Sequence, residues 1–488
     1  MKLDHTKAPL FETLLKYNTD GIVPFHVPAH KQGNFCDPAF KQYLGENTLK
    51  IDLTLTSDLN HFHNPVGSYL ESEILAADAY GADDAYFLIN GTSGGVQAMI
   101  MAACAPNDKI LIPRNVHKSV LAGLIITGAI PVYIEPEHSN EWDFALGLKA
   151  ADVQKALDSD PEIVTVFLVH PTYFGVVSEL QEIVEICKQR DVLVLVDEAH
   201  GSHIYFHEDL PISAMSAGAD ISASSTHKMA GSMTQSSMLF VRNPERVMRG
   251  KKPLQRHKIR TILAYLQTTS PSYILLASLD TSRREMALNG RKHVQNAIDL
   301  ANYARHELNK IEGCKVMTID GYDPTKLVIS SKEMGITGKQ LIRDLRKAPH
   351  NIELEMSFFF GVLALFTIGD TQQTADALIN ACRAVFAEYS PQNITIPNSA
   401  PPTPKMILTP RQAHFADYET EIISFTQSLG RVCAEAALSY PPGIPIIAPG
   451  EQIDQPTFDY IKTMQQYTMN FQGPQDKLLH NITVFKGI

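Results

Sequence analysis

The stretch Val192-Leu193-Val194-Leu195-Val196-Asp197-Glu198-Ala199-His200 is the part of the sequence that decides the fold. Its first five residues form an uninterrupted aliphatic run, which is typical of a strand buried on both faces of a parallel sheet. Asp197 follows at the point where this strand ends. Because ligands of open α/β sheets bind at the carboxyl ends of the strands, the stretch predicts a functional site as well as a fold.

The sequence around this strand alternates between strands and helices from about residue 67 to residue 243. The alternation predicts an α/β domain with a mostly parallel sheet. After Pro271 the pattern changes to long helices and then to a short α+β unit. The expected strands are 85–90, 109–113, 131–135, 163–169, 192–196 and 326–330; the expected helices are 94–105, 117–128, 151–157, 180–189, 273–288, 291–311 and 338–347.

Composition narrows the class of protein. The 488 residues include 42 Lys and Arg against 53 Asp and Glu, a net charge of −11 that argues against general nucleic-acid binding. The N-terminus lacks the pattern of a signal peptide, and the apolar stretch 120–134 is shorter than the about 20 residues that span a bilayer. The six cysteines form no Cys-x-x-Cys pair, so we expect a reduced, cytoplasmic protein.

A glycine-rich turn lies between the first expected strand and its helix. Asn90-Gly91-Thr92-Ser93-Gly94-Gly95 combines small residues with the start of a helix, where free N–H groups bind anions. The spacing is neither that of a P-loop nor that of the dinucleotide fingerprint. The turn therefore predicts a phosphate site at Thr92, Ser93 and Gly94, or simply a tight turn that needs glycine.

Three further groups follow expected strands. Asp197 is either the partner of a protonated ring nitrogen or a cap of the next helix. Lys228, after Ser224-Ser225-Thr226-His227, is either a Schiff-base lysine or an exposed loop residue. His117 either stacks on a planar ring or caps a helix. Asp197 and Lys228 are 31 residues apart, enough for a helix and another strand, so both can reach one cleft.

Histidines also raise the question of a metal. His200, His203 and His207 are spaced like one face of a helix, and His61 and His63 flank Phe62. No complete zinc signature such as His-Glu-x-x-His is present. We therefore expect no metal.

Taken together, these motifs resemble those of fold-type-I pyridoxal-phosphate enzymes, and specifically of the bacterial ornithine/lysine/arginine decarboxylase family. The resemblance runs from Phe25 to the C-terminus, and the length is similar to that of the short biosynthetic arginine decarboxylases. Two positions depart from the family pattern, namely Ala29 and His170. The motifs also include Pro28-Ala29-His30-Lys31-Gln32-Gly33, His61-Phe62-His63-Asn64-Pro65, Pro171-Thr172-Tyr173-Phe174-Gly175, Thr268-Thr269-Ser270-Pro271, Tyr440-Pro441-Pro442-Gly443 and Pro449-Gly450-Glu451.

The resemblance implies a role for each site residue. Lys228 forms the Schiff base with pyridoxal phosphate, Asp197 pairs with the pyridine nitrogen, and His117 and Ala199 lie on the two ring faces. His200 lies beside the cofactor, and Thr172 lies near the ring hydroxyl. The phosphate is surrounded by Thr92, Ser93, Gly94, Ser225 and His227. Catalysis rests on Lys228, His117 and Asp197.

The resemblance also implies a domain plan and a dimer. The segment 268–270 reaches the phosphate of a partner subunit, so we expect a homodimer or higher homo-oligomer with shared active sites. The expected parts are an N-terminal segment and dimer-interface region 1–66, a cofactor-binding large domain 67–275, a small α+β domain 276–390, a Pro-rich linker 391–405 with five prolines, and a C-terminal domain 406–488.

The implied reaction is decarboxylation of a small basic amino acid, with L-arginine giving agmatine and carbon dioxide for polyamine biosynthesis. Lysine and ornithine are the alternative substrates, and Asp58 or Glu451 is a candidate partner for the distal cation. An aminotransferase is a further alternative, but residues 347–381 contain no Arg to clamp a substrate carboxylate. A non-catalytic regulatory relative is disfavoured because Lys228 is intact. Neither a nucleic acid nor a membrane is expected as a partner.

Overall fold

The computed structural model describes residues 3–56, 59, 62–242, 256–392, 401–439, 443–466 and 471–488. These residues form two compact units. The first unit comprises Met1–Ala103 and Leu193–Val294, and the second comprises Cys104–Val192 and Gln295–Ile488. Among the described residues, no helix has the combined length and apolarity that crossing a membrane requires.

Four strands form the sheet of the first unit: β1 (Asp84–Leu88), β7 (Leu193–Asp197), β8 (Ile221–Ser224) and β9 (Ser237–Val241), in the order β1-β9-β8-β7. β7 and β8 are parallel, whereas β9 is antiparallel to both β8 and β1. Every residue of β7, β8 and β9 is buried. The apolar run 192–196 is thus the buried parallel strand that the sequence predicts, with Asp197 as its last residue.

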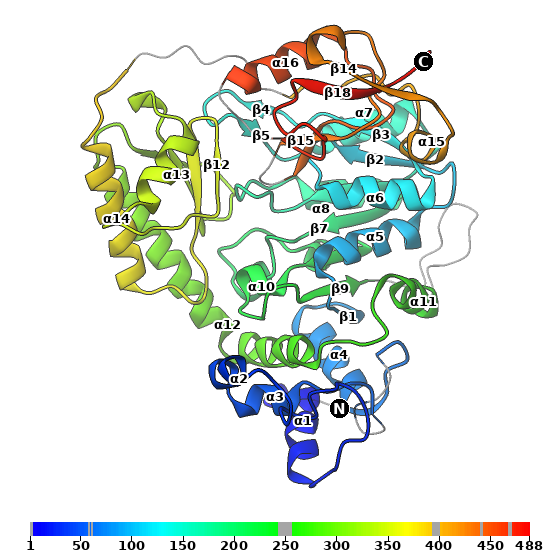
Figure 1. Ribbon diagram of the computed structural model, residues 1–488, viewed down its shortest axis with the longest axis vertical. Coiled ribbons are helices and arrows are strands. Elements are labelled where there is room, and N and C mark those ends of the chain that lie inside the picture. The colour runs from blue at the N-terminus through cyan, green and yellow to red at the C-terminus, as the bar shows by residue number, and fades with distance from the viewer. Residues whose placement is uncertain are drawn as a thin grey trace. The chain divides into compact units, whose positions relative to one another are not determined.

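The helix α5 (Gly91–Ala103) packs directly on this sheet (Figure 1). Gly95 makes the close approach possible, because a Cβ at that position would lie 2.9 Å from the Ala223 Cβ and 2.8 Å from the Leu88 Cδ1. Gly91 begins the helix at a positive φ of 65°, which glycine adopts without strain. The other helices of this unit are α1 (Pro9–Thr19), α2 (Pro38–Leu44), α3 (Glu46–Ile51), α4 (Gly67–Ala79), α9 (Ala214–Ala217), α10 (Thr226–Met229), α11 (Arg256–Leu266), the 3-10 turn Ile204–Phe206 and the first part of α12 (Tyr273–Leu308).

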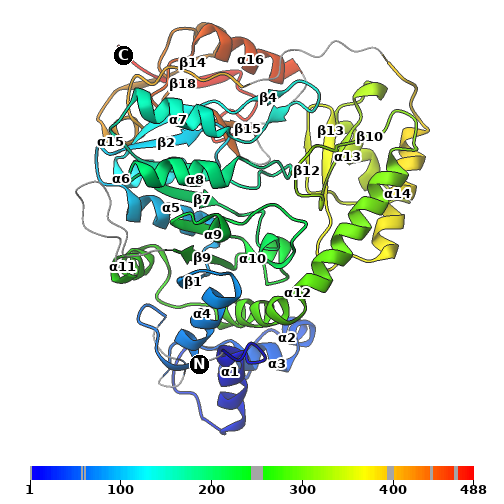
Figure 2. The same cartoon turned by 180° about the vertical axis from the view of Figure 1, so that it is seen from behind.

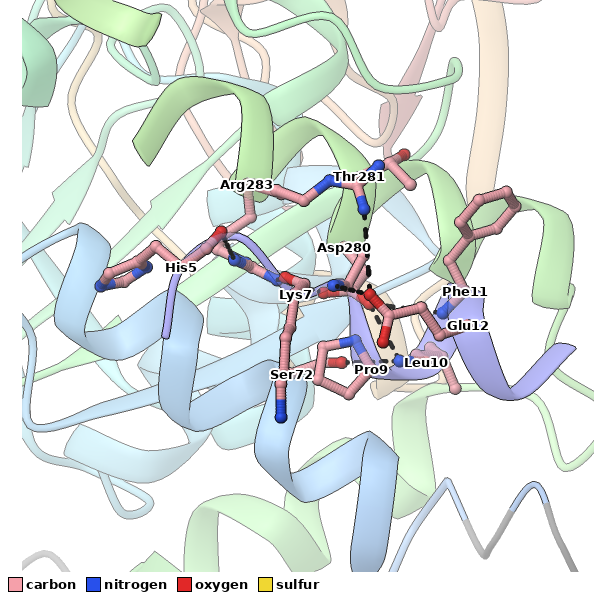
Figure 3. A network of polar contacts seen from close by, with 12 residues as sticks. His5, Lys7, Pro9, Leu10, Phe11, Glu12, Ser72, Asp280, Thr281 and Arg283 are labelled. Carbon is pink, nitrogen blue, oxygen red and sulfur yellow. Dashed lines mark hydrogen bonds and ion pairs between the residues drawn. The ribbon is translucent and has the colours of Figure 1, made fainter. Parts of the chain in front are cut away.

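A buried ion pair anchors the N-terminal segment on α12 (Figure 3). The Asp280 Oδ2 accepts the backbone N–H groups of Leu10 and Phe11 at 2.9 and 3.3 Å, in the first turn of α1. Its Oδ1 accepts from Arg283 at 2.6 Å, and Arg283 also donates to the Lys7 carbonyl at 2.7 Å. No side chain of its own caps α1, so the Asp280 carboxylate satisfies the free N–H groups of that helix.

The second unit contains three small assemblies. In the first, β6 (Ile163–Val169), β2 (Lys109–Pro113) and β3 (Ile130–Ile134) are parallel neighbours, with α6 (Lys118–Thr127), α7 (Ala150–Ser159) and α8 (Leu180–Gln189) as the intervening helices. A short hairpin pairs β4 (His138–Ser139) with β5 (Phe144–Ala145).

The second assembly is an antiparallel sheet in the order β10-β11-β13-β12, from β10 (Lys315–Val316), β11 (Lys326–Ser330), β12 (Met356–Phe358) and β13 (Gly361–Leu365). The helices α13 (Gly338–Arg346) and α14 (Gln372–Phe386) share one apolar core with this sheet and with the last turns of α12 (Figure 2). A 3-10 turn covers Lys332–Met334.

The third assembly is the C-terminal part. It comprises α15 (Pro410–Phe415), β14 (Thr420–Ser424), a 3-10 turn at Phe425–Gln427, β15 (Ala437–Ser439), β16 (Ile444–Ile447), α16 (Gln455–Gln466), β17 (Phe471–Gln472) and β18 (Asn481–Phe485). β14 pairs with β18, and β16, β15 and β17 form a separate sheet. Residues 393–400 of the expected linker and residues 440–442 of the Tyr-Pro-Pro-Gly motif lie outside the described residues. The predicted domain boundaries stay a prediction.

The expected elements agree closely with the structure, with one difference in the helices. Strands 109–113, 163–169 and 326–330 and helix 180–189 have the bounds that the sequence predicts. The separate helical patterns 273–288 and 291–311 are parts of one helix, α12, which continues through Gly290. The Phe206 ring packs against Gly290, since a Cβ on Gly290 would lie 3.1 Å from that ring. Gly290 therefore allows close packing and does not break the helix.

Gly95→Ala tests the packing of α5. We expect the added methyl group to lower the free energy of unfolding by about 1–3 kcal/mol, the usual cost of overpacking. Gly94→Ala is the matched control in the same turn, since its Cβ would meet no atom closer than 3.4 Å. Chemical denaturation of the two variants measures the difference; equal stabilities would show that α5 does not depend on this approach.

Candidate active site

A cluster of hydroxyl groups lies at the N-terminal end of α5. The Thr92 Oγ1 lies 2.6 Å from the Ser225 Oγ and 3.1 Å from the Ser237 Oγ. Thr92 and Ser225 are buried, Gly94 is buried beside them in the chain, and Ser93 is exposed. Hydroxyl donors together with the free N–H groups of a helix N-terminus form an arrangement suited to a phosphate. The glycine turn is therefore both a tight turn and a possible anion site.

Lys228 and Asp197 lie at the same edge of the first unit's sheet. β7 ends at Asp197 and the neighbouring parallel strand β8 ends at Ser224, with Asp197 opposite Ala223. Lys228 follows on the short helix α10, and its Nζ lies 2.9 Å from the His200 Nε2. The alternative of an exposed loop lysine does not describe this residue, which is half-buried.

Asp197 is a buried carboxylate with only 5% of its surface exposed. Its Oδ1 accepts the N–H of Ala199 at 3.0 Å. Burial raises the pKa of Asp197, while the Ala199 hydrogen bond and the charge of Lys228 lower it. Burial is the largest of these effects, so a cationic partner at this carboxylate would relieve the cost of holding it ionised.

Glu198 is a residue whose role the sequence pattern does not predict. It is fully buried, accepts the N–H of Ala214 at 2.7 Å and accepts a hydrogen bond from the Tyr205 hydroxyl. Burial raises its pKa to about 7. Glu198 therefore ties the strand end to the segment 205–214, and its place next to Asp197 in the sequence is the only signal that marks it.

His227 is held by the loop that precedes β9. Its Nδ1 lies 2.8 Å from the Ser236 carbonyl oxygen, so the ring donates a proton there and directs its Nε2 elsewhere.

The first unit alone contains nine of the predicted site residues: Thr92, Ser93, Gly94, Asp197, Ala199, His200, Ser225, His227 and Lys228.

His117 and Thr172 belong to the second unit, after the neighbouring strands β2 and β6. His117 is the N-cap of α6, since its Nδ1 accepts the N–H of Ser119 at 3.2 Å. This is the capping alternative of the sequence analysis. Thr172 is buried and accepts the N–H of Val176 at 3.2 Å, in the turn that Gly175 closes at a φ of 82°.

Glu451, a candidate partner for the distal cation of the substrate, is paired with Arg114 in the structure. Its two carboxylate oxygens accept from the Arg114 guanidinium at 2.6 and 2.7 Å, and it also accepts the N–H of Ala448 at 2.7 Å. Arg114 lies over the ring of Tyr133, 4.7 Å from its centroid, at the end of β2. Glu451 is thus used to anchor the C-terminal part. Asp58 and His61 lie outside the described residues.

The described part of the chain holds no group of three or more His, Cys, Asp or Glu side chains that is placed to bind a metal ion.

Comparison with solved structures defines the class. The fold matches that of the lysine decarboxylase of Francisella novicida with a TM-score of 0.83 at 20% identity, over 98% of this chain and 81% of that one. A serine palmitoyltransferase of Sphingomonas wittichii matches with a TM-score of 0.53 at 18% identity, over 74% of this chain and 86% of that one. The fold is that of the fold-type-I pyridoxal-phosphate enzymes.

Sequence comparisons narrow the class to a family. The arginine decarboxylase of Bacillus subtilis (strain 168) is 43% identical over 491 residues, and that of Halalkalibacterium halodurans is 42% identical over 496 residues; each match covers 98% of both chains. Family models match as the major domain (residues 8–321) and the C-terminal domain (residues 396–479) of Orn/Lys/Arg decarboxylases. The chain belongs to the Orn/Lys/Arg decarboxylase family, and it is a carboxy-lyase that uses pyridoxal phosphate.

The residues of the first unit fit this cofactor. A buried carboxylate, an amine that interacts with it electrostatically, and a hydroxyl cluster at a helix N-terminus match its ring nitrogen, its aldehyde and its phosphate, respectively. Family membership also decides against the aminotransferase alternative.

Asp197→Asn separates the stability of this site from its function. Because burial raises the pKa of Asp197, the ionised carboxylate destabilises the folded apoprotein at pH 7. We expect the amide, which can still accept from Ala199, to raise the apoprotein's melting temperature at pH 7. This gain disappears below pH about 4, where the carboxyl is protonated in both folded and unfolded chains.

The same variant should bind pyridoxal phosphate more weakly. Asp152→Asn, on the exposed face of α7, is the control. A lower melting temperature for Asp197→Asn at pH 7 would contradict the assignment of burial as the main cost at this position.

Proposed function

We propose that this protein decarboxylates L-arginine, giving agmatine and carbon dioxide, as a step of polyamine biosynthesis. The observation that carries the proposal is the identity of 42–43% with proteins named arginine decarboxylase, over 98% of both chains. More distant relatives are named for either substrate: lysine decarboxylases from Pseudomonas aeruginosa and Escherichia coli are 24% and 23% identical, and a biodegradative arginine decarboxylase from Escherichia coli is 23% identical. Lysine and ornithine remain the alternative substrates.

We assign the predicted residues to the cofactor as follows. When bound, pyridoxal phosphate supplies an electron sink for the electron pair that the departing carbon dioxide leaves behind. Lys228 would hold it covalently, and Asp197 would pair with its ring nitrogen. The remaining contacts would come from Thr92, Ser93, Gly94, Ser225 and His227 at the phosphate, Thr172 at the ring hydroxyl, His117 and Ala199 at the ring faces, and His200 beside it.

The chain's own groups move the proton that replaces carbon dioxide. The His200 Nε2, at 2.9 Å, orients the Lys228 amino group by accepting a hydrogen bond from it. His117 accepts a backbone N–H at Nδ1, so its ring proton in the neutral form lies on Nε2. Lys228 and His117 are therefore the two candidate proton donors.

Offering arginine, lysine and ornithine separately tests the substrate. We expect release of carbon dioxide and formation of agmatine from arginine, identified by mass spectrometry, with a kcat/KM at least about tenfold above those for the other two. Lys228→Ala should lose the visible absorbance of the bound cofactor and at least about 100-fold in kcat, since proton transfer alone contributes that much.

Lys292→Ala, an exposed lysine of α12, is the control and should match the wild-type chain. Preferred formation of cadaverine or putrescine would replace arginine by lysine or ornithine, and full activity of Lys228→Ala would defeat the assignment of the lysine.

We also propose that the active sites are completed in a homodimer. Large apolar side chains of the N-terminal segment are exposed, with Val23 at 73%, Phe25 at 96%, Phe35 at 83% and Tyr43 at 89%. Exposed apolar surface of this kind is typical of interfaces. The segment 268–270 is also exposed, which suits its expected place at a partner's phosphate.

Phe25→Asp tests this interface. We expect the wild-type chain to have the mass of a dimer or a higher oligomer in solution, and Phe25→Asp to shift toward the monomer and to lose activity, because a buried charge opposes association. Ile422→Asp, at an apolar residue of β14 that is 63% exposed, should leave the mass unchanged. Light scattering after gel filtration measures the mass, and a monomeric, active wild-type chain would contradict the proposal.

We place the protein in the cytoplasm. None of the six cysteines, all of which lie among the described residues, is in a disulfide, and five of them are buried. Such thiols are typical of a reducing compartment.

A further inference from the structure

The second unit contains a cavity of about 320 Å³ at the carboxyl ends of its parallel strands. Asn115 follows β2, Glu135 follows β3 and Thr172 follows β6, and all three line the cavity. The β4–β5 hairpin, the segment 173–174, β12, residues 401 and 403, β16 and α16 also contribute lining residues. Two features connect the cavity to the proposed active site: Thr172 is itself an assigned residue, and Asn115 lies two positions before His117.

The walls of this cavity are mostly aromatic. The rings of Phe144 and Phe174 are stacked, with centroids 4.0 Å apart and an interplanar angle of 7°. Phe358 meets Phe174 edge-on at 5.4 Å, and Tyr460 contributes a further ring. Apolar walls with a few polar groups are typical of ligand pockets.

Some polar atoms of residues that line the cavity have no hydrogen-bond partner among the described residues. Among the described residues, the buried side-chain atoms without a hydrogen-bond partner include Asn115 Oδ1, His138 Nδ1 and Thr403 Oγ1, and all three residues line this cavity. Burial lowers the pKa of His138, which keeps its ring neutral and able to accept. Arg114 Nε, a donor, is a fourth such atom of a lining residue. Because buried polar groups are normally paired, the three atoms that can accept indicate a ligand with several hydrogen-bond donors.

The charges indicate that this ligand is a cation. Asp143 and Glu135 line the cavity, and the charge of Asp143 acts on both His138 and Tyr460. Arg114 also lines it, but Glu451 neutralises its guanidinium through two hydrogen bonds. Aromatic faces attract cations, and a planar guanidinium stacks on them and loses less hydration than an ammonium.

We propose that this cavity binds the guanidinium group of the substrate, with Asp143 as its counter-charge and with Asn115, His138 and Thr403 as hydrogen-bond acceptors. The inference rests on the proposed arginine decarboxylation and adds the residues that select arginine over lysine. Asn115 provides an amide oxygen, Thr403 provides a hydroxyl, and the aromatic rings provide the walls.

Asp143→Asn is the sharpest test. Asp143 has a left-handed backbone, with a φ of 62°, which asparagine adopts readily, so the fold should be retained. In the holoenzyme we expect the KM for arginine to rise about tenfold or more, with a smaller change in kcat and a reduced preference for arginine over lysine. Agmatine, measured by titration calorimetry, should bind at least about tenfold more weakly, as loss of one charge interaction implies.

Asp152→Asn, an exposed carboxylate of α7 outside the cavity, is the matched control and should bind agmatine as the wild-type chain does. The inference is overturned if the wild-type chain decarboxylates arginine but Asp143→Asn and Asp152→Asn have equal KM values and equal agmatine affinities. It is also overturned if agmatine binding depends on Asp143 but does not compete with arginine. A wild-type chain that binds cofactor and consumes no arginine would instead reject the proposed function.

Discussion

The burial of one carboxylate is the constraint on which the site depends. Asp197 ends a strand whose every residue is buried, and its backbone-bonded carboxylate lies where desolvation raises its pKa. The hydrogen bond from Ala199 and a cationic partner both offset that cost. The positive charge of Lys228 contributes to the offset, and a protonated cofactor ring would contribute more. Asp197 is therefore a buried carboxylate that a cationic group of the cofactor would stabilise, as we propose.

The parts around Asp197 hold their positions through contacts that do not touch the cofactor. Gly95 lets α5 approach the sheet, which brings Thr92 within 2.6 Å of Ser225. Glu198 fixes the backbone behind Asp197 through Ala214 and Tyr205. Asp280 and Arg283 attach the N-terminal segment to α12. Each of these contacts positions an element of the fold. Only a few side chains are proposed to take part in the reaction.

The second unit also contains a buried ion pair that positions its elements. Two nitrogens of the Arg114 guanidinium hydrogen-bond to Glu451, and this pair attaches the C-terminal part to the end of β2, next to Asn115 and His117. The neighbouring cavity combines aromatic walls with polar atoms that have no hydrogen-bond partner among the described residues. The ion pair holds the structure, whereas the neighbouring acceptors are groups that we propose bind a ligand.

The sequence by itself determined the strand and helix order and the buried strand before Asp197, whereas the residues proposed for the phosphate and the Schiff base stay a prediction. These features are local, because hydrophobic periodicity and glycine spacing depend on neighbours along the chain. Only the tertiary structure decided the continuity of α12 through Gly290, the antiparallel direction of β9, and the partner of Glu451. It also revealed Glu198 as an anchor and Asp143 and His138 as lining one cavity. Such features depend on contacts between residues far apart in the sequence, and spacing along the chain does not encode which buried charges meet.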